Sequence, residues 1–322
     1  MRVFATGGNG FIGSAVVRTL LTQGHAVRCL LRETSDTARI DGLDVERVYG
    51  DVRDADSVSQ GAAGCDAIIH LACLSAWKEI DSPLLDEVVE RGTGNVLAAA
   101  RSHGLRVVYV SSVLAVNGSD RPEVFDESAT FALPDRKLRY ARCKLRGEAL
   151  CLDAWRGGVP VVIVNPTEVY GPDDTALVTA GNLIDFATSR PVLVCHGGTS
   201  VAFVDDVALA VVRALERGRP GERYILGGEN LTVRRLAELT LEILGLERRI
   251  VTVPTSLMRA LATVALSLHL PLPFEPRVAP YATRYWFVDS AKATRELGVE
   301  FRSAREALEP TLRWLQESGR VA

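Results

Sequence analysis

Tyr140 and Lys144 are two residues whose types and spacing could carry acid–base chemistry. Lysine occurs four times in the 322 residues, and this copy stands four positions after a tyrosine. On a helix, positions i and i+4 share one face, so the Lys144 ammonium can lie beside the Tyr140 phenol. A nearby positive charge lowers the pKa of a phenol from its usual value of about 10. The pair could therefore exchange a proton with a substrate near neutral pH, although an accidental pair on a solvated helix face would have the same spacing.

A glycine-rich turn near the N-terminus decides between these two interpretations. Residues 3–5 predict a short strand and residues 14–22 predict a helix. Between them lies the run Gly7-Gly8-Asn9-Gly10-Phe11-Ile12-Gly13. Glycines at such a strand-to-helix turn let the backbone approach a pyrophosphate, and the helix N-terminus then holds the phosphates. We therefore predict a dinucleotide site that includes Gly7, Gly10, Phe11, Ile12 and Gly13.

Arg32 follows the second predicted strand, at residues 27–31. An acidic residue near this position would bind the ribose 2′-hydroxyl of NAD, whereas an arginine suits the 2′-phosphate of NADP. The acidic neighbour Glu33 is expected to point the other way. Arg32 could instead merely cap a solvated strand end. We expect NADP(H) to be preferred, with NAD(H) as the alternative cofactor.

Strand-like and helix-like segments alternate through the first half of the chain. Further strands are predicted at residues 45–49, 67–71, 107–110 and 161–164, and further helices at 54–62, 84–102 and 140–155. This rhythm predicts an α/β fold, a Rossmann-type doubly wound parallel sheet with a ligand crevice at the carboxyl ends of its strands. We expect an NAD(P)-binding domain of residues 1–165, to which residues 200–228 return. Residues 166–199 and 229–322 would form a smaller, interleaved C-terminal substrate lobe.

Several small or polar residues follow the predicted strands and would face this crevice. Asp51, beside Val52, could accept a hydrogen bond from an adenine amino group, or it could simply cap the next helix. The pair Leu71-Ala72 would let the backbone approach a cofactor ribose, or would be an ordinary strand end. A hydroxyl of Ser111 or Ser112 could polarise a substrate carbonyl next to Tyr140, or could be a solvated loop serine. The segment from Asn165 to Val169, which includes Pro166, would lie beside a nicotinamide.

Bulk composition narrows the function classes. A formal net charge of -3 gives no general attraction to nucleic acid or acidic membranes. The six cysteines lack a C-x-x-C spacing and indicate reduced thiols of a cytoplasmic protein. The five histidines are scattered, so no metal site is predicted. Residues 260–268 are strongly apolar but far shorter than the roughly 20 residues that span a bilayer. We expect a buried or pocket-covering helix there, no stable membrane insertion, and a small-molecule substrate; the chain could form a homodimer.

These motifs as a set resemble the extended short-chain dehydrogenase/reductase superfamily, of the NAD-dependent epimerase/dehydratase type. The resemblance covers nearly the whole chain, and it is closest to dihydroflavonol-4-reductase-like reductases and to hopanoid-associated sugar epimerases. It implies that Ser112, Tyr140 and Lys144 form a catalytic triad. Ser112 is preferred to Ser111 because residues 112–117 match a reductase pattern. The resemblance also implies cofactor contacts from the glycine loop and from Arg32, Asp51, Val52, Leu71, Ala72, Tyr140, Lys144, Pro166 and Val169.

Three positions depart from the pattern of the nucleotide-sugar enzymes in this superfamily. Val89 stands where many relatives carry an asparagine, and Phe203 stands where a histidine is usual. Glu168 replaces an asparagine that helps to bind the substrate diphosphate. A carboxylate facing a diphosphate is repulsive. The three changes predict a site that is less sugar-like and more apolar.

Two mechanisms fit the same residues. As a reductase, the protein would reduce a ketone or aldehyde with NADPH, with Ser112 binding the carbonyl oxygen and Tyr140 donating the proton. As a sugar-nucleotide epimerase or dehydratase, it would retain its cofactor, and Tyr140 would first remove a hydroxyl proton. Arg32, Glu168 and the apolar residues 257–270 favour the reductase. A third class, a redox-sensing or scaffold protein that binds NADP without turnover, is disfavoured by the intact triad.

Overall fold

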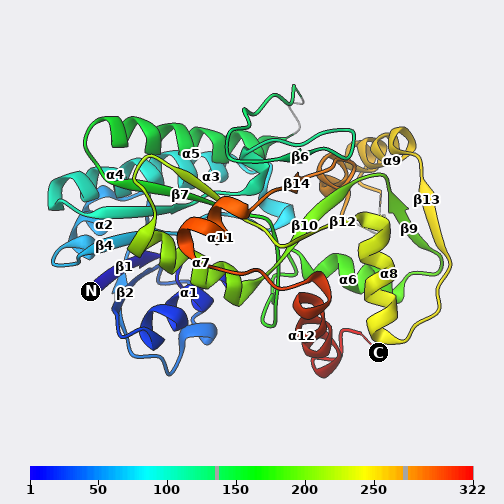
Figure 1. Cartoon of the computed structure of the whole chain (residues 1–322), viewed down its shortest axis with the longest axis horizontal. Helices are drawn as coiled ribbons and strands as arrows, with labels where there is room; N and C mark the ends of the chain where they lie inside the picture. The colour runs from blue at the N-terminus through cyan, green and yellow to red at the C-terminus, as the bar shows by residue number, and fades with distance from the viewer. Residues whose placement is uncertain (135–137, 271–274, 322) are drawn as a thin grey trace.

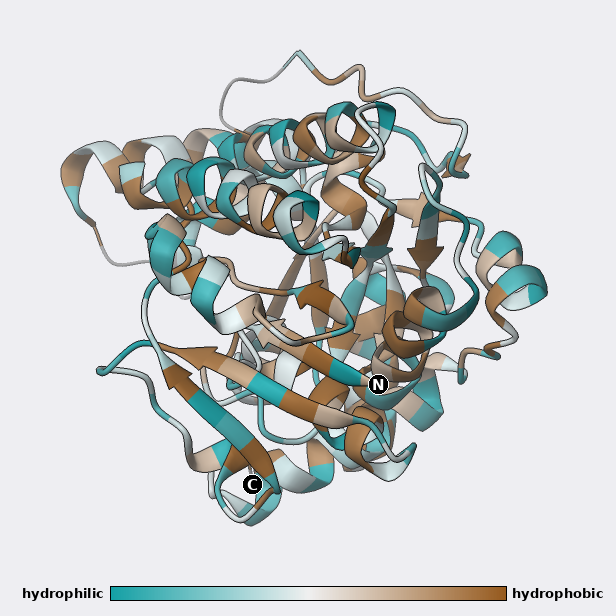
Figure 2. Ribbon diagram, turned by 90° about the vertical axis from the view of Figure 1, so that its left-hand side faces the viewer, coloured by the Kyte–Doolittle hydropathy of each residue, from teal (hydrophilic) through white to brown (hydrophobic). Residues whose placement is uncertain are grey.

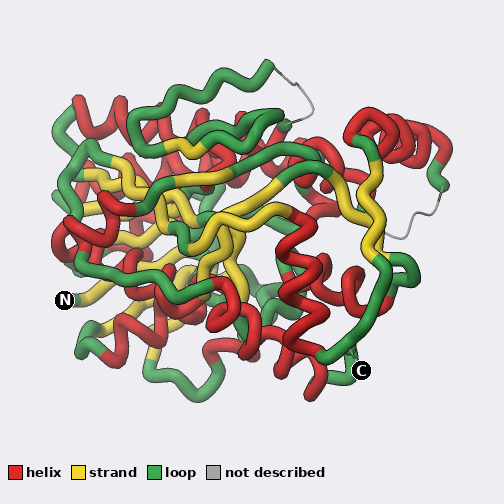
Figure 3. The backbone as a smooth tube through the Cα atoms, turned by 45° about the vertical axis from the view of Figure 1, so that its right-hand side comes forward, coloured by secondary structure: helices red, strands yellow, loops and turns green. Residues whose placement is uncertain are grey.

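The computed structural model describes residues 1–134, 138–270 and 275–321. Two parts of unequal size lie side by side (Figure 1), with the N-terminus in the larger part and the C-terminus in the smaller one. The larger part has a sheet with helices on both sides (Figure 3). Within the described chain, none of the helices combines the length and the apolar character that crossing a bilayer requires.

The large sheet is parallel throughout. Among the described residues it has seven strands in the order β11-β7-β5-β4-β1-β2-β3. Their bounds are Arg2–Thr6 (β1), Ala26–Leu31 (β2), Val45–Tyr49 (β3), Ala67–His70 (β4), Arg106–Val110 (β5), Val161–Pro166 (β7) and Arg223–Leu226 (β11). The order of the strands reverses between β1 and β4, which leaves a crevice at their carboxyl ends. The predicted Rossmann-type fold is confirmed.

Helices cover both faces of this sheet. One face carries α2 (Ala55–Ala62), α4 (Gly92–His103) and α5 (Arg139–Arg156), and the other carries α1 (Phe11–Thr22), α7 (Val204–Arg217) and α11 (Ala291–Leu297). The central strands are largely hydrophobic (Figure 2), as expected for a sheet that is buried on both faces. The two faces pack separate hydrophobic cores around Val16 and Leu20 on one side and Ile68 and Val96 on the other.

The helix predicted at residues 84–102 is divided into three segments. These are α3 (Pro83–Asp86), a π-helical turn (Glu87–Arg91) and α4. A π-helical turn inserts an extra residue into a helix and so rotates the side chains that follow it. The prediction of one continuous α-helix over residues 84–102 was therefore wrong at the π-helical turn.

The smaller part is built from the remaining short elements. Its strands are β8 (Glu168–Tyr170), β9 (Val192–Cys195), β10 (Gly198–Phe203), β12 (Glu229–Thr232) and β13 (Ile250–Val253), and β14 (Phe287–Val288) pairs with β6 (Val124–Phe125). Its helices are α6 (Ala180–Thr188), α8 (Val233–Leu244), α9 (Thr255–Leu268), α10 (Ala279–Ala282) and α12 (Ala304–Glu317). Since β11 and α11 pack on the larger part, the chain passes between the two parts more than once.

The apolar segment at residues 260–268 lies in α9. One side of this helix is buried through Met258, Ala262 and Ala265, and Met258 faces the main cavity. The other side leaves large side chains in solvent, among them Leu261 at 45 % and Leu268 at 64 % exposure. The expectation of a buried or pocket-covering helix therefore holds for one face of α9 and is wrong for the other.

Candidate functional site

One cavity of about 1460 Å³ runs along the carboxyl ends of the large sheet and into the smaller part. It brings together every residue that the sequence singled out for catalysis or cofactor contact. Those residues are Gly7, Gly10, Phe11, Ile12, Gly13, Arg32, Asp51, Val52, Leu71, Ala72, Ser112, Tyr140, Lys144, Pro166 and Val169.

Two positions of the glycine loop, Gly7 and Gly13, leave no room for a side chain. Gly7 has a φ of +72°, and a β-carbon there would stand 2.7 Å from the backbone nitrogen of Ala72. A β-carbon on Gly13 would stand 2.0 Å from the Gly7 carbonyl oxygen. That oxygen also accepts a hydrogen bond from the Gly10 amide at 3.0 Å. The turn thus presents bare backbone at the N-terminus of α1, and this cradle fits the pyrophosphate of a dinucleotide.

Arg32 is exposed at the end of β2 and lines the cavity together with Ser35, whose hydroxyl accepts a hydrogen bond from the Arg32 amide at 3.1 Å. Glu33 is not among the lining residues. Asp51 is held by the Arg53 guanidinium at 2.8 and 3.0 Å. Hydrogen bonds from Arg53 keep the pKa of Asp51 below its usual value, and the charge of Arg32 adds to the effect. Ser35 and Arg53 were missed by the sequence analysis.

Helix α5 carries Tyr140 and Lys144 on the face that looks into the cavity. Lys144 is buried, and its ammonium donates a hydrogen bond to the Val110 carbonyl oxygen at 2.9 Å. The same nitrogen lies 5.9 Å from the centre of the Tyr140 ring. Ser112 caps the short turn after β5 by accepting a hydrogen bond from the Leu114 amide. All three side chains line the same cavity.

The acidity of Tyr140 differs from the expectation. Burial raises the pKa of Tyr140 well above its usual range, and the neighbouring Cys73 thiol adds to the increase. The Lys144 ammonium is directed at a backbone carbonyl and sits near the ring. Burial therefore outweighs any lowering of the Tyr140 pKa by Lys144, and the expected net decrease in this pKa is not found. The phenol remains protonated at neutral pH, which suits a proton donor.

A buried carboxylate below the triad was missed. Glu148 lies one turn after Lys144 on α5 and is 1 % exposed. Its Oε1 accepts hydrogen bonds from the Ser111 hydroxyl and from the Asn165 amide, both at 2.6 Å. The Asn165 amide also donates to the Ser112 carbonyl oxygen at 2.9 Å. Ser111 therefore belongs to this internal network, and both Ser111 and Ser112 line the cavity. The i+4 spacing from Lys144 was the signal that could have revealed Glu148.

His70 is a buried residue that links elements on both sides of the crevice. Its Nδ1 lies 2.6 Å from the Thr6 hydroxyl at the end of β1, and its Nε2 lies 3.2 Å from the Thr93 hydroxyl on α4. Burial, together with the charge of Lys144, lowers the pKa of His70 to about 3. The imidazole is therefore neutral at physiological pH and acts as a structural link between β1, β4 and α4.

Only one of the three departures from the sugar-enzyme pattern is found in the cavity wall. Val89 is buried against Leu85 and Cys143, and Phe203 is buried beneath the guanidinium of Arg302 at 4.4 Å. Neither lines the cavity, whereas Glu168 does. The expectation that Val89 and Phe203 make the site more apolar is therefore not supported by their positions.

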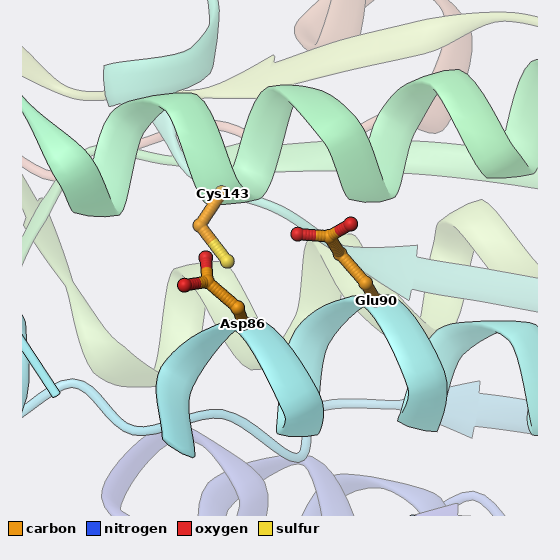
Figure 4. Close-up of side chains that lie close together, drawn as sticks. All are labelled: Asp86, Glu90 and Cys143. Carbon is orange, nitrogen blue, oxygen red and sulfur yellow. The ribbon is translucent and has the colours of Figure 1, made fainter. Parts of the chain in front are cut away.

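A small cluster of possible metal ligands lies beneath α5. Figure 4 shows Asp86, Glu90 and Cys143 directed toward one another. The two oxygens of Asp86 are engaged by Arg139 and Arg146, and Arg146 also donates to Glu90 at 2.6 Å. Burial raises the pKa of Cys143 to about 12, so the thiol is protonated. We interpret the cluster as an ion-pair network that joins α3 and the π-helical turn to α5.

The chain is similar to proteins of known families. Residues 3–227 match the model of the NAD dependent epimerase/dehydratase family. The chain is 34 % identical to a Synechocystis sp. protein named as a dihydroflavonol 4-reductase, over 99 % of this chain and 95 % of that one. It is 32 % identical to 4-hydroxy-2-methyl-3-oxo-4-farnesyl-3,4-dihydroquinoline-1-oxide ketoreductase of Stigmatella aurantiaca, over 100 % of this chain and 98 % of that one.

A solved structure extends the likeness to the whole fold. The dTDP-glucose 4,6-dehydratase DesIV of Streptomyces venezuelae, solved as a double mutant with NAD and DAU bound, superimposes with a TM-score of 0.78. It is 26 % identical in sequence and covers 98 % of this chain and 97 % of its own. The fold, the crevice with its glycine cradle and these relatives lead to one conclusion: the chain belongs to the NAD-dependent epimerase/dehydratase family, within the extended short-chain dehydrogenases/reductases, and is an NAD(P)-dependent enzyme.

Proposed function

We propose that the protein is an NADP(H)-dependent reductase of a ketone or aldehyde group on a fairly apolar small molecule. The observation that carries this proposal is the position of Ser112, Tyr140 and Lys144 in the wall of a cavity whose outer part is mostly apolar. Small-molecule sites combine such a lining with a few well-placed polar groups. The relatives named as a dihydroflavonol 4-reductase and as a ketoreductase support carbonyl reduction.

The preference for NADP(H) rests on the end of β2. Arg32 is exposed, lines the cavity, and is followed by the hydroxyl of Ser35, so a guanidinium and a hydroxyl are both available to a ribose 2′-phosphate. An arginine can bind a phosphate through two parallel hydrogen bonds. The reduced nicotinamide would supply the hydride when bound in the crevice.

The side chains of this protein would then manage the oxygen of the substrate. The Ser112 hydroxyl would donate a hydrogen bond to the carbonyl oxygen and so orient it. The Tyr140 phenol, which burial keeps protonated, would donate its proton to the oxygen as negative charge develops there. Lys144, fixed by the Val110 carbonyl, would stabilise the phenolate that remains. Each group acts on charge that develops in the transition state.

The second candidate is a nucleotide-sugar epimerase or dehydratase, which the likeness to DesIV favours. In that reaction Tyr140 would have to be a phenolate in order to accept the substrate proton, and its raised pKa means that little phenolate is present at neutral pH. Glu168 would also bring negative charge to the site expected for the diphosphate. Both observations support the reductase.

The two candidates are separated by one pair of assays. In the first, the protein is incubated with NADPH and a panel of aryl and alkyl ketones, and the absorbance of NADPH is followed. In the second, it is incubated with nucleotide sugars and no added cofactor, and the products are separated by chromatography. We expect NADPH consumption in the first assay. An epimerised or dehydrated sugar in the second, with no NADPH loss in the first, would establish the second candidate instead.

A further inference from the structure

The outer cavity is lined mostly by apolar side chains, with one polar wall, and Arg190 and Glu275 also line it. Side chains such as Leu177, Phe186, Val194 and Met258 provide most of its surface. The polar wall is formed by β8 and α6, where Glu168, Asn182 and Asp185 line the same space. This wall follows directly on Pro166, and the reacting groups Ser112 and Tyr140 line the same cavity. A substrate that binds to Ser112 and Tyr140 would therefore lie in the same cavity as the polar wall.

Glu168 is held firmly by neutral groups. Its Oε1 accepts a hydrogen bond from the Tyr170 hydroxyl at 2.7 Å and another from the Asn182 amide at 2.8 Å. The same amide nitrogen lies 2.8 Å from the Tyr170 hydroxyl oxygen, which closes a triangle of polar groups. The Thr199 hydroxyl forms a further hydrogen bond with the carboxyl group. The orientation of Glu168 is therefore fixed before any substrate arrives.

No basic side chain of the described residues supports the charge of this carboxylate. Burial raises the pKa of Glu168, and the groups that oppose the increase are the hydroxyls of Tyr170 and Thr199 and the amide of Asn182. A partly buried carboxylate without a cation is a poor neighbour for a phosphate, since the two negative charges repel each other. It is a strong acceptor for a hydrogen bond from a neutral hydroxyl group.

Two more acceptors lie on the same wall. The Oδ1 of Asn182 is buried and has no hydrogen-bond partner among the described residues. Asp185 lies one turn further along α6, and no hydrogen bond or ion pair of its carboxylate occurs within the described ranges. A buried acceptor such as the Asn182 Oδ1 is costly unless a donor reaches it. A ligand that offers hydrogen-bond donors would therefore satisfy this wall.

We propose that Glu168 is a specificity-determining residue that selects ketones bearing a hydroxyl group away from the carbonyl. This inference rests on the proposed reductase function and narrows its substrate class to hydroxylated apolar ketones. The hydroxyl donates its hydrogen to the Glu168 carboxyl group, and the apolar walls enclose the rest of the molecule. A molecule of the same shape without the hydroxyl group leaves the acceptors of the wall without a hydrogen-bond donor. Such a loss can discriminate strongly between substrates.

The test uses three probes of one shape: benzylacetone, its para-hydroxy derivative, and the methyl ether of that derivative. Each is titrated by calorimetry into the protein saturated with NADP⁺, where no reduction can occur. We expect the hydroxy compound to bind about tenfold more tightly than the methyl ether, the discrimination expected from one hydrogen bond to a charged group. Equal affinities for the two compounds in the parent protein would overturn the proposal.

Variants assign the effect to Glu168. Glu168→Leu should bind the hydroxy compound and the ether equally, and Glu168→Gln, which keeps the size and an acceptor oxygen, should retain part of the preference. The matched control is Glu300→Leu, which alters an exposed glutamate outside the cavity and should keep the full preference. Circular dichroism confirms that each variant is folded. A full preference in both Glu168 variants would overturn the assignment.

Two further outcomes distinguish this proposal from others. A para-aminomethyl probe that binds more tightly than the hydroxy compound would mean that the wall recognises a cation, and would overturn the hydroxyl assignment. The same three probes are then offered with NADPH. If none is reduced but the hydroxy preference in binding persists, the recognition stands and the proposed reductase function fails. If all are reduced without preference, the function stands and the recognition fails.

Discussion

Replacement of Glu148 provides a test that requires no knowledge of the substrate. Glu148 is 1 % exposed and accepts hydrogen bonds from Ser111 and Asn165 at 2.6 Å. Its second oxygen lies 3.4 Å from the guanidinium of Arg223. Glu148→Ala removes these contacts at once and leaves the Ser111 hydroxyl buried without its acceptor. Because Asn165 also holds the backbone of Ser112, the variant should loosen the catalytic wall as well.

The size of the effect follows from the contacts. Removal of one partner of a buried charged network costs about 3–5 kcal/mol, so we expect Glu148→Ala to lose that much stability. Burial raises the pKa of Glu148, so the carboxylate itself carries a desolvation penalty that the variant relieves, and this places the loss nearer the lower figure. Glu148→Gln keeps an oxygen for Ser111 and Asn165 and loses only the charge, so its cost should be about 1–2 kcal/mol.

Urea unfolding followed by tryptophan fluorescence measures both variants against the parent. The control is Glu300→Ala, an exposed glutamate whose replacement should change stability by no more than about 0.5 kcal/mol. Activity with a ketone that the parent reduces should fall in Glu148→Ala more than in Glu148→Gln. An unfolding midpoint of Glu148→Ala that matches the control would refute the reasoning, since the network would then contribute nothing to the fold.

Three further outcomes are expected. Arg32→Ala should weaken NADPH binding tenfold or more and leave NADH binding nearly unchanged, because a charge-assisted contact of about 1.5–3 kcal/mol is lost; equal parent affinities for the two cofactors, measured by calorimetry, would contradict this. Tyr140→Phe should abolish turnover but keep cofactor binding. Lys144→Arg should not keep the activity of the parent, because a guanidinium has a different shape from an ammonium. Substantial turnover of Tyr140→Phe would assign the proton to another donor. Burial raises the pKa of Asp185 to about 6, so its ionisation lowers stability as the pH rises from about 4 through 6. Asp185→Asn should therefore be more stable than the parent by about 1–2 kcal/mol near pH 7, after allowance for partial solvent access, and should show little gain near pH 4 in urea unfolding. The same gain at both pH values would argue against this.

The large sheet could be predicted because its signals are local. β3 was predicted at the residues where it occurs, and β1, β2, β5 and β7 were displaced by one or two residues at their ends. Buried parallel strands are short apolar runs, and glycine turns separate them from helices that have their own period. The glycine loop was predictable from its pattern between a strand and a helix, although only the steric demand on Gly13 is local, because Gly7 is constrained by the distant backbone of Ala72.

The chemistry of the site was less predictable because it depends on distant segments. Tyr140 packs near Tyr281, whose hydroxyl accepts a hydrogen bond from the Tyr140 amide at 3.2 Å, and this burial raises its pKa. Motif comparison identified Phe203 as a substitution but could not show that its ring packs under Arg302, away from the cavity. Glu148 resembles an ordinary helix-surface charge until Asn165 from another strand is placed against it.

The position of β11 has a consequence for how the chain is made. β7 is fully buried along Val161–Pro166, yet its outer neighbour, Arg223–Leu226, is synthesised some sixty residues later. Until the ribosome has released that segment, the nascent sheet ends in a bare apolar edge, the kind of surface that pairs with other chains. Fragments that stop before β11 should therefore aggregate or occupy chaperones during translation, and the smaller part cannot be exchanged as one contiguous segment of the chain.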